Sequence, residues 1–297
     1  MRTPRELQAL YREGRNIIQL LKQESGVEAN TDDIIEMAYE LQSGSYIRAM
    51  THPEFAEHKR LYSQEIARRI LALCEPQSVM EAGVGEATTL SGVLSNLPPG
   101  TASYGFDLSW SRVAYARQWL KDHSLTDFTL CTGNLFDIPF TDNAVDVVYT
   151  SHSIEPNGGN EKPILQELLR VARRYLILLE PGYELANEEA RRRMEFHGYC
   201  KNLEATAVTL GANVVRHELF PFSANPLNPT AITVIEKKEQ AAAPGQILAC
   251  PQFKTPLQER AGALYSAEAL AIYPVIDGIP CLRRENAILA TQFEQRL

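Results

Sequence analysis

The 297-residue sequence lacks three features that mark large classes of proteins: a long apolar run, a surplus of basic residues and regularly spaced cysteines. No stretch approaches the roughly 18 uninterrupted apolar residues that span a bilayer. Residues 1–16 contain no apolar segment of the secretory type. The net charge of −8 argues against a general nucleic-acid-binding protein, because such proteins usually carry a basic face. We therefore expect a globular protein without a membrane or nucleic-acid partner.

The five cysteines are scattered along the chain and form no CxxC pair. An odd, irregular set fits a reducing compartment, so we expect the cytoplasm. No HExxH motif occurs, and most histidines share no metal-ligand spacing, so we predict no metal in the chemistry. We interpret these histidines as ordinary surface or half-buried residues: His52, His58, His123, His197 and His217.

The chain changes its pattern near residue 73. Apolar residues recur at three- and four-residue spacing before this point, which predicts helices. Strand-like segments then alternate with helical ones, which predicts an α/β fold with a doubly wound, mostly parallel sheet. The last two segments have no helix-length gap between them, so we expect a hairpin-like edge. The seven predicted strands are residues 78–82, 102–107, 128–133, 145–150, 175–180, 214–222 and 229–238.

These patterns divide the chain into four parts. We predict a helical N-terminal cap over residues 1–72 and an α/β domain over 73–238. Residues 239–246, "EQAAAPGQ", have the composition of a linker. Residues 247–297 contain short strand-like runs separated by turns, which indicate a small β-rich C-terminal domain.

A glycine-containing turn, "SVMEAGVGEATTL" over residues 78–90, follows the first predicted strand and precedes a helix. A dinucleotide fingerprint would place a third glycine at position 88, where this chain has Thr88. The carboxylates of Glu81 and Glu86 would repel a pyrophosphate. They suit a ligand that carries an ammonium and a sulfonium.

Glu81, Gly83 and Gly85 together resemble the first motif of the class I S-adenosylmethionine-dependent methyltransferases, which have a Rossmann-like fold. The resemblance extends over residues 77–180 and implies S-adenosylmethionine as cofactor. Asp107 matches the acid that binds both ribose hydroxyls, and Asn134 stands where an acid usually faces the adenine. The chain also has Ala87 where the family often has a third glycine. The resemblance implies these cofactor-binding residues: Glu81, Gly83, Gly85, Asp107, Asn134, Leu135 and Ser151.

The next loop, "SHSIEPNGGNE" over residues 151–161, lies where this family places residues that face the substrate. One hypothesis is that His152 is the general base, with Glu155 orienting it or the substrate. The alternative is that His152 lines the cofactor and only positions it. We predict substrate contacts from Asn157 and from the strand-end residue Glu180, which could instead cap a helix near Asn187.

The segment "SGSYIRAM" over residues 43–50 could cover the cofactor. It makes Tyr46 and Arg48 candidates for contact with the cofactor or substrate. The alternative is that both are surface residues without a role.

The C-terminal segment resembles the small zinc-ribbon family that includes the activator subunit of RNA and release-factor methyltransferases. The residues that match are Cys250-Pro251, Lys254, Pro256-Leu257, Pro274 and Asp277-Gly278-Ile279-Pro280. Phe253 and Ser266 occupy cysteine positions, so Cys250 and Cys281 cannot complete a tetrahedral site. We predict a degenerate ribbon without zinc that packs around Leu257, Ile272, Tyr273 and Ile279. It would pack on the catalytic domain or help it to dimerise.

The resemblance implies a bacterial-type cytoplasmic methyltransferase that acts on a small molecule, for example a hydroxyl or amine of a sugar or sugar nucleotide. One alternative is a tRNA or protein methyltransferase, because the ribbon family activates such enzymes. Another alternative is a non-catalytic scaffold that has kept the cofactor fold. A homodimer is the expected partner arrangement.

Overall fold

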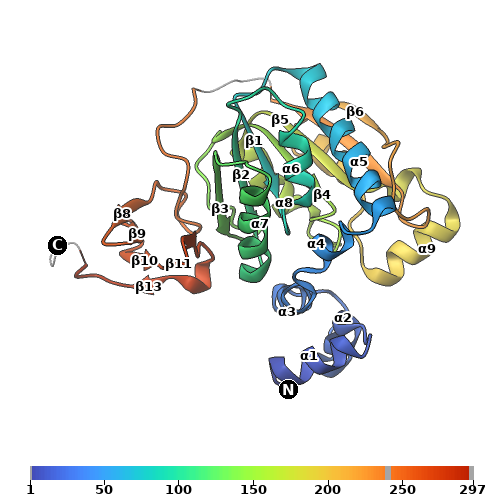
Figure 1. Ribbon diagram of the computed structural model, residues 1–297, viewed down its shortest axis with the longest axis horizontal. Helices are drawn as coiled ribbons and strands as arrows, with labels where there is room; N and C mark the ends of the chain where they lie inside the picture. Colours follow the sequence, from blue (N-terminus) through green and yellow to red (C-terminus); the bar gives the residue numbers. More distant parts are fainter. Residues whose placement is uncertain (1, 238–241, 294–297) are drawn as a thin grey trace.

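The computed structural model describes residues 2–237 and 242–293 (Figure 1). Its core is a seven-stranded sheet in the order β3-β2-β1-β4-β5-β7-β6. The strands β1 to β5 are parallel, and β7 runs antiparallel to both β5 and β6. The predicted α/β fold and its hairpin-like edge are thus confirmed. The strands are β1 (Ser78–Ala82), β2 (Ala102–Asp107), β3 (Phe128–Thr132), β4 (Val145–Ser151), β5 (Ala172–Pro181), β6 (Asn213–Leu219) and β7 (Thr230–Glu236).

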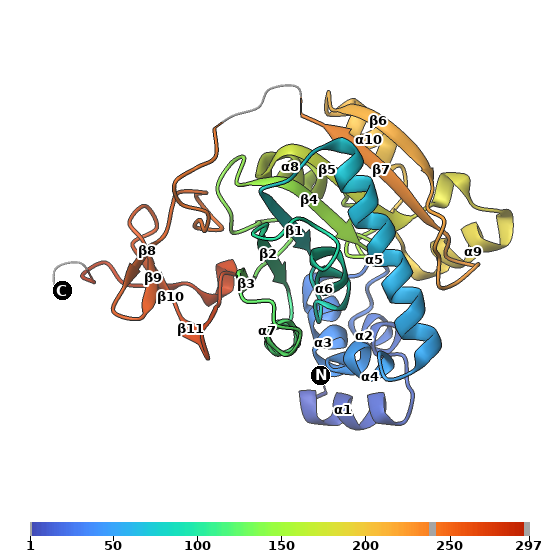
Figure 2. The same ribbon diagram turned by 45° about the horizontal axis from the view of Figure 1, so that its top comes forward.

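Helices cover both faces of this sheet (Figures 1 and 2). On one face α5, α6 and α7 bury their apolar residues against the sheet, and on the other face α8 and α10 do so. The strands are apolar on both sides because both faces are covered, as in β4, where six residues in succession are buried. The helices are α5 (Pro53–Leu73), α6 (Thr88–Leu94), α7 (Trp110–Asp122), α8 (Glu161–Val171), α9 (Glu188–His197) and α10 (Leu203–Thr209), with the 3-10 turn η1 (Tyr183–Leu185).

The strands β1 and β4 are adjacent in the middle of the sheet, and the strand order reverses between them. In an open α/β sheet, ligands bind beyond the carboxyl ends of the strands at such a point. Four N-terminal helices gather at this end of the sheet (Figure 2). They are α1 (Pro4–Arg12), α2 (Ile17–Ser25), α3 (Asp32–Gln42) and α4 (Ser45–Ala49).

The C-terminal region forms a four-stranded sheet in the order β13-β10-β9-β8 and the two-stranded pair β11-β12. It lies beside β3 (Figure 1), where the Leu282 N–H donates to the Thr132 carbonyl oxygen at 3.2 Å. Cys250, Leu257 and Tyr273 are buried in the same apolar cluster as the large sheet. The elements are β8 (Gln258–Arg260), β9 (Ala263–Ser266), β10 (Ala271–Tyr273), β11 (Val275–Ile276), β12 (Ile279–Pro280), η2 (Arg284–Asn286) and β13 (Ile288–Leu289).

Leu257, Tyr273 and Ile279 are buried as the sequence predicts, whereas Ile272 is half-buried. The Cys250 thiol lies 3.5 Å from the Tyr273 hydroxyl. Within residues 2–237 and 242–293, no group of three or more His, Cys, Asp or Glu side chains could hold a metal ion. The first part of the predicted linker, residues 239–241, lies outside the described residues. None of the helices that the structure describes is long and apolar enough to cross a bilayer.

Candidate active site

A cavity of about 380 Å³ lies between the carboxyl ends of the central strands and the helices α3, α4 and α5. It brings together residues that are far apart in the chain. Most of the sequence-predicted site residues line it, and they come from β1, β2, β4, the loops that follow β1, β3 and β4, and the helix α4. These residues are Glu81, Gly83, Gly85, Asp107, Asn134, Leu135, Ser151, His152, Glu155, Asn157 and Tyr46.

The glycine turn after β1 needs its glycines for backbone conformation and for close packing. Gly83 and Gly85 have φ values of 75° and 53°, in the left-handed region that favours glycine. A Cβ atom on Gly83 would lie 2.2 Å from the Ser153 Cβ atom, so a side chain there would collide with the turn after β4. The glycine turn and the β4 turn are therefore packed directly against each other.

Asp107 at the end of β2 is buried and fixed by the backbone around it. Its Oδ2 atom accepts the Gly85 N–H at 2.9 Å, and its Oδ1 atom accepts the Ser109 N–H at 3.0 Å. Burial raises the pKa of this carboxyl, and the nearby Arg112 guanidinium opposes that rise. Each carboxylate oxygen has a further lone pair, so Asp107 can also accept two ligand hydroxyl groups.

Glu81, at the end of β1, and Lys59 are buried near each other, and each affects the charge of the other. The Glu81 side chain is buried, accepts the Tyr149 hydroxyl at 3.2 Å and has a pKa raised to about 8 by burial. The Lys59 ammonium from α5 donates to the Thr89 hydroxyl at 2.8 Å, and burial lowers its pKa. The Lys59 charge also favours the ionised form of Glu81.

This donor set fits S-adenosylmethionine. A carboxylate beside an ammonium and a hydroxyl can bind the ammonium and carboxylate of an amino acid, and Asp107 can bind a diol such as a ribose. The apolar side chains of Ile35, Leu108 and Leu135 also line the cavity, and apolar surfaces of this kind suit a flat base. When bound, the cofactor supplies a methyl group on a positively charged sulfur.

The carboxylate of Glu86 binds backbone N–H groups of the N-terminal helices and is not free to bind a ligand cation. Its Oε1 atom accepts the Gly44 N–H and its Oε2 atom accepts the Ile47 N–H, both at 2.8 Å. Glu86 therefore ties the glycine turn to α4, and much of its negative charge is balanced by these N–H groups. Glu86 therefore adds little to an electrostatic preference for a cationic ligand.

Asn134 lines the cavity, but both ends of its side-chain amide are already bonded. The Oδ1 atom accepts the Phe136 N–H at 3.0 Å, and the Nδ2 atom donates to Asp32 Oδ2 at 2.6 Å. Asp32 belongs to α3 and also lines the cavity. A carboxylate from the N-terminal helices thus stands next to the position where the family usually has an acid.

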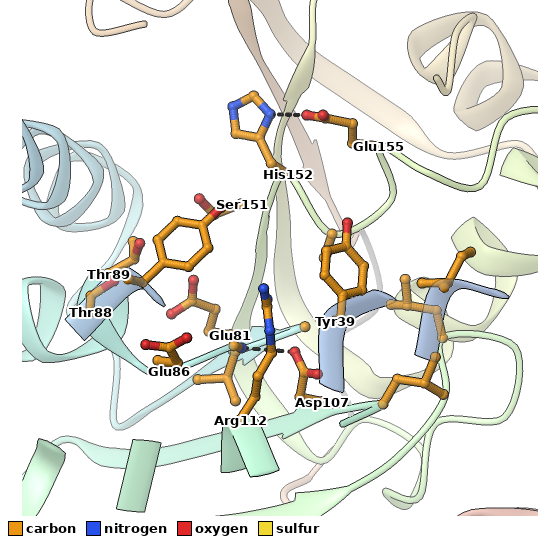
Figure 3. A pocket seen from close by; sticks show the side chains of 18 of the residues that line it. Tyr39, Glu81, Glu86, Thr88, Thr89, Asp107, Arg112, Ser151, His152 and Glu155 are labelled. Atoms are coloured by element: carbon orange, nitrogen blue, oxygen red, sulfur yellow. Dashed lines mark hydrogen bonds and ion pairs between the residues drawn. The ribbon is translucent and has the colours of Figure 1, made fainter. Parts of the chain in front are cut away.

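His152 and Glu155 form a hydrogen-bonded pair at the other end of the cavity (Figure 3). The His152 Nδ1 atom lies 2.5 Å from Glu155 Oε2, and its Nε2 atom lies 2.9 Å from the Thr230 hydroxyl. Asn228 donates a further bond to Glu155 at 3.1 Å. Burial opposes charge on both groups. The bond between them prevails, so the pKa of His152 is raised and the pKa of Glu155 is lowered.

Two of the predicted substrate contacts are placed elsewhere by the structure. Glu180 does not line the cavity, because its carboxylate is turned toward the backbone N–H groups of residues 153–155. It does not cap α9 either, since Asn187 itself accepts the Ala190 N–H. Arg48 lies on α4 beside Gly44 and does not line the cavity, whereas Tyr46 does.

The part of the cavity wall that the helices contribute was not predicted from the sequence. The sequence marks Lys59 only as a cation within the apolar stripe of α5. A lysine in such a position is usually solvated, so this signal does not identify a site residue. His58 is half-buried, as one of the two predicted alternatives has it, and it also lines the cavity and stacks on Tyr62. The missed residues that line the cavity include Asp32, Tyr39, Phe55, His58, Lys59, Tyr62, Arg112, Asn225 and Asn228.

Comparison with known proteins agrees with this site. Residues 75–219 match the family model described as "Methyltransferase domain". No curated protein matches the chain significantly in sequence.

Two solved structures of magnesium protoporphyrin IX methyltransferase from Synechocystis PCC 6803 share the fold. The structure with bound SAH is 14% identical, with a TM-score of 0.56 over 70% of this chain and 100% of that chain. The structure with bound SAM is 15% identical, with a TM-score of 0.52 over 70% of this chain and 97% of that chain. Residues 75–219 thus match a methyltransferase domain, and the solved structures show that its fold is that of a methyltransferase.

Proposed function

We propose that the protein methylates a hydroxyl group of a small neutral molecule, with His152 as the general base. The observation that carries this proposal is the His152–Glu155 pair at the end of the cavity away from Asp107. A carboxylate on Nδ1 holds the imidazole in the form whose Nε2 atom can accept a proton. In this structure Nε2 accepts the Thr230 hydroxyl at 2.9 Å, so a substrate hydroxyl has to replace Thr230 as the donor to Nε2.

The residues then divide the reaction as follows. His152 Nε2 takes the proton of the substrate hydroxyl as the oxygen forms its bond to the methyl carbon. The carboxylate of Glu155 stabilises the imidazolium that results. Alignment of the oxygen with the methyl group also lowers the activation free energy, because positioning alone contributes several kcal/mol in such displacements. The products are a methyl ether and neutral S-adenosylhomocysteine, and the proton leaves from His152 to water.

The charges along the cavity favour a neutral acceptor over a sugar nucleotide. Lys59 and Arg112 lie near Glu81 and Asp107, whose carboxylates balance these cations, and Lys59 also acts on His152 from a distance. The wall near His152 carries Glu155 and the amides of Asn157, Asn225 and Asn228. Amides bind hydroxyl groups, whereas a diphosphate needs cations. We therefore take a sugar or another polyhydroxylated compound as the substrate class.

The test is release of S-adenosylhomocysteine with a panel of monosaccharides, polyols, phenols and primary amines. We expect turnover with hydroxyl compounds. His152→Ala is expected to lower turnover at least 100-fold while leaving the Kd for S-adenosylhomocysteine within threefold. His123→Ala, at an exposed position after α7, is the control and should match the wild type. Turnover of amines alone, or full turnover by His152→Ala, would refute the proposal.

Further sequence predictions remain proposals at this point. We propose a cytoplasmic location, since all five cysteines are free and buried. The division into a cap, an α/β domain, a linker and a C-terminal domain is proposed with the boundaries given above. A homodimer also remains a prediction, which light scattering of the purified protein would test.

A further inference from the structure

The turn after β4 is held by a buried carboxylate that the proposed chemistry does not use. Three consecutive backbone N–H groups, those of Ser153, Ile154 and Glu155, donate to Glu180. The distances are 3.1 Å and 3.1 Å to Oε1 and 3.0 Å to Oε2. Glu180 lies at the end of β5, and its side chain is only 1% exposed. The carboxylate therefore occupies the position of an anion bound by a backbone concavity.

The turn adopts a conformation that needs such support. His152 has a φ of 57°, and a left-handed backbone costs a residue other than glycine about 1 kcal/mol or more. The His152 N–H continues the pairing with β5 by donating to the Leu179 carbonyl oxygen at 2.9 Å. The chain then turns, and the next three backbone N–H groups no longer pair with β5. Unpaired buried N–H groups are costly, so a single acceptor for all three stabilises this turn.

The other side of the turn meets the cofactor end of the cavity. Ser153 packs so closely on Gly83 that any side chain at position 83 would collide with it. The turn is therefore fixed between Glu180 behind it and the glycine turn in front of it. This fixed segment carries the paired side chains of His152 and Glu155 at its two ends.

We infer that Glu180 is a positioning residue, which sets the backbone of residues 152–155 so that His152 and Glu155 pair and face the cavity. The assignment of a catalytic purpose to that pair rests on the proposed function. The positioning itself depends only on the contacts above. Glu180 acts through the turn and touches neither cofactor nor substrate.

The experiment uses the full-length protein and readouts that need no acceptor substrate. In Glu180→Gln, one carboxylate oxygen becomes an NH₂ group that faces backbone N–H donors, so at least one of the three bonds is lost. We expect hydrogen exchange of the amides of residues 153–155 to accelerate at least tenfold. We also expect loss of the hydrogen-bonded His152 Nδ1 proton signal in NMR spectra. The Kd for S-adenosylhomocysteine by calorimetry should stay within threefold.

Glu184→Gln is the matched control. Glu184 also accepts a backbone N–H, that of Asn202, but it does not contact the turn. This variant should leave both the amide exchange of residues 153–155 and the His152 signal unchanged. If Glu180→Gln leaves them unchanged as well, the inference is wrong.

If Glu180→Gln does not fold, the wild-type protein still decides the question. The amides of residues 153–155 should then exchange at least 100-fold more slowly than in an unstructured peptide, although they lie outside regular secondary structure. Rates near those of a free peptide would overturn the inference. Failure of the proposed function would instead appear as full turnover by His152→Ala, which these measurements do not involve.

Discussion

The floor of the cavity and its cover differ in how their polar groups are held. On the floor, the strand-end residues Glu81 and Asp107 are 2% and 7% exposed, and neighbouring strands and turns supply their hydrogen bonds. The cover consists of α3, α4 and the start of α5, and its Tyr46 is 37% exposed. The floor therefore determines which ligand chemistry fits, and the cover adds contacts that close the cavity.

Polar contacts of several residues connect these two parts. Glu86 accepts N–H groups of Gly44 and Ile47, Lys59 donates to Thr89, and Asn134 donates to Asp32. Each contact joins a loop or helix start of the α/β domain to one of the N-terminal helices. Changes on the floor should thus affect binding most, and changes farther into the cover progressively less.

The largest effect is expected from Asp107→Ala on the floor. The substitution removes the acceptor for two ligand hydroxyl groups and leaves the Gly85 and Ser109 N–H groups without their partner. Hydrogen bonds to charged groups contribute about 1.5–3 kcal/mol, so the Kd for S-adenosylhomocysteine should rise about 100-fold in calorimetry. Asp127→Ala, an exposed carboxylate before β3, should bind as the wild type does. Equal Kd values for both variants would show that Asp107 does not contact the ligand.

The cover should give the next largest effect, through Lys59→Met. The buried ammonium is expected to bind the carboxylate of the amino-acid part of the ligand, and methionine keeps most of the apolar volume of the side chain. We expect the Kd for S-adenosylhomocysteine to rise about 30-fold. Arg60→Met, at the next and exposed position of α5, is the control. An unchanged Kd in Lys59→Met would mean that Lys59 serves only to balance Glu81.

This contrast also explains how much of the site the sequence could reveal. Glu81, Gly83, Gly85 and Asp107 are predictable because each lies at a strand end or in the turn that follows it, and parallel strands present these ends at one edge of the sheet. The predicted seven-stranded fold holds for the same reason, since alternating strands and helices leave few arrangements.

The cover was not predictable because its contributions depend on tertiary packing. Lys59 becomes a site residue only because α5 crosses the end of β1, and nothing near it in the sequence signals this. Asp32 looks like an ordinary first-turn acid of a helix, yet the fold brings it to within 2.6 Å of Asn134. For Glu180, the sequence predicts the position at the end of a strand correctly but not the contacts of the side chain. Its carboxylate accepts the backbone N–H groups of residues 153–155 and does not line the cavity.

A smaller effect is expected from pH, acting on the floor through Glu81. Burial raises its pKa to about 8, and a ligand ammonium would favour the ionised carboxylate, so binding should release a proton. The affinity for S-adenosylhomocysteine should therefore rise about tenfold between pH 6.5 and 8 and then level off. In Glu81→Gln this dependence should disappear. A flat pH profile in the wild type would contradict the role of Glu81.

The same shift in the pKa of Glu81 has a defined sign for stability without ligand. The folded-state pKa lies above the ordinary value of 4.5, so the folded protein binds the proton more tightly than the unfolded chain. The contribution of Glu81 is present in full below pH 4.5 and is lost as the pH rises through 8. Denaturant unfolding of the wild type and Glu81→Gln should accordingly diverge as the pH rises over this range.

The smallest effect should come from a contact on the far side of the cover. Arg283 of the C-terminal region is 8% exposed and pairs with Glu36 of α3, the helix whose Asp32, Ile35 and Tyr39 line the cavity. Arg283→Ala should loosen α3 and raise the Kd for S-adenosylhomocysteine about threefold. Because the two residues act through one contact, adding Glu36→Gln should raise it no further. Arg284→Ala, which breaks the more exposed pair with Asp137, should have no effect on the Kd. An additive double variant would mean that the C-terminal region does not support the cover through this pair.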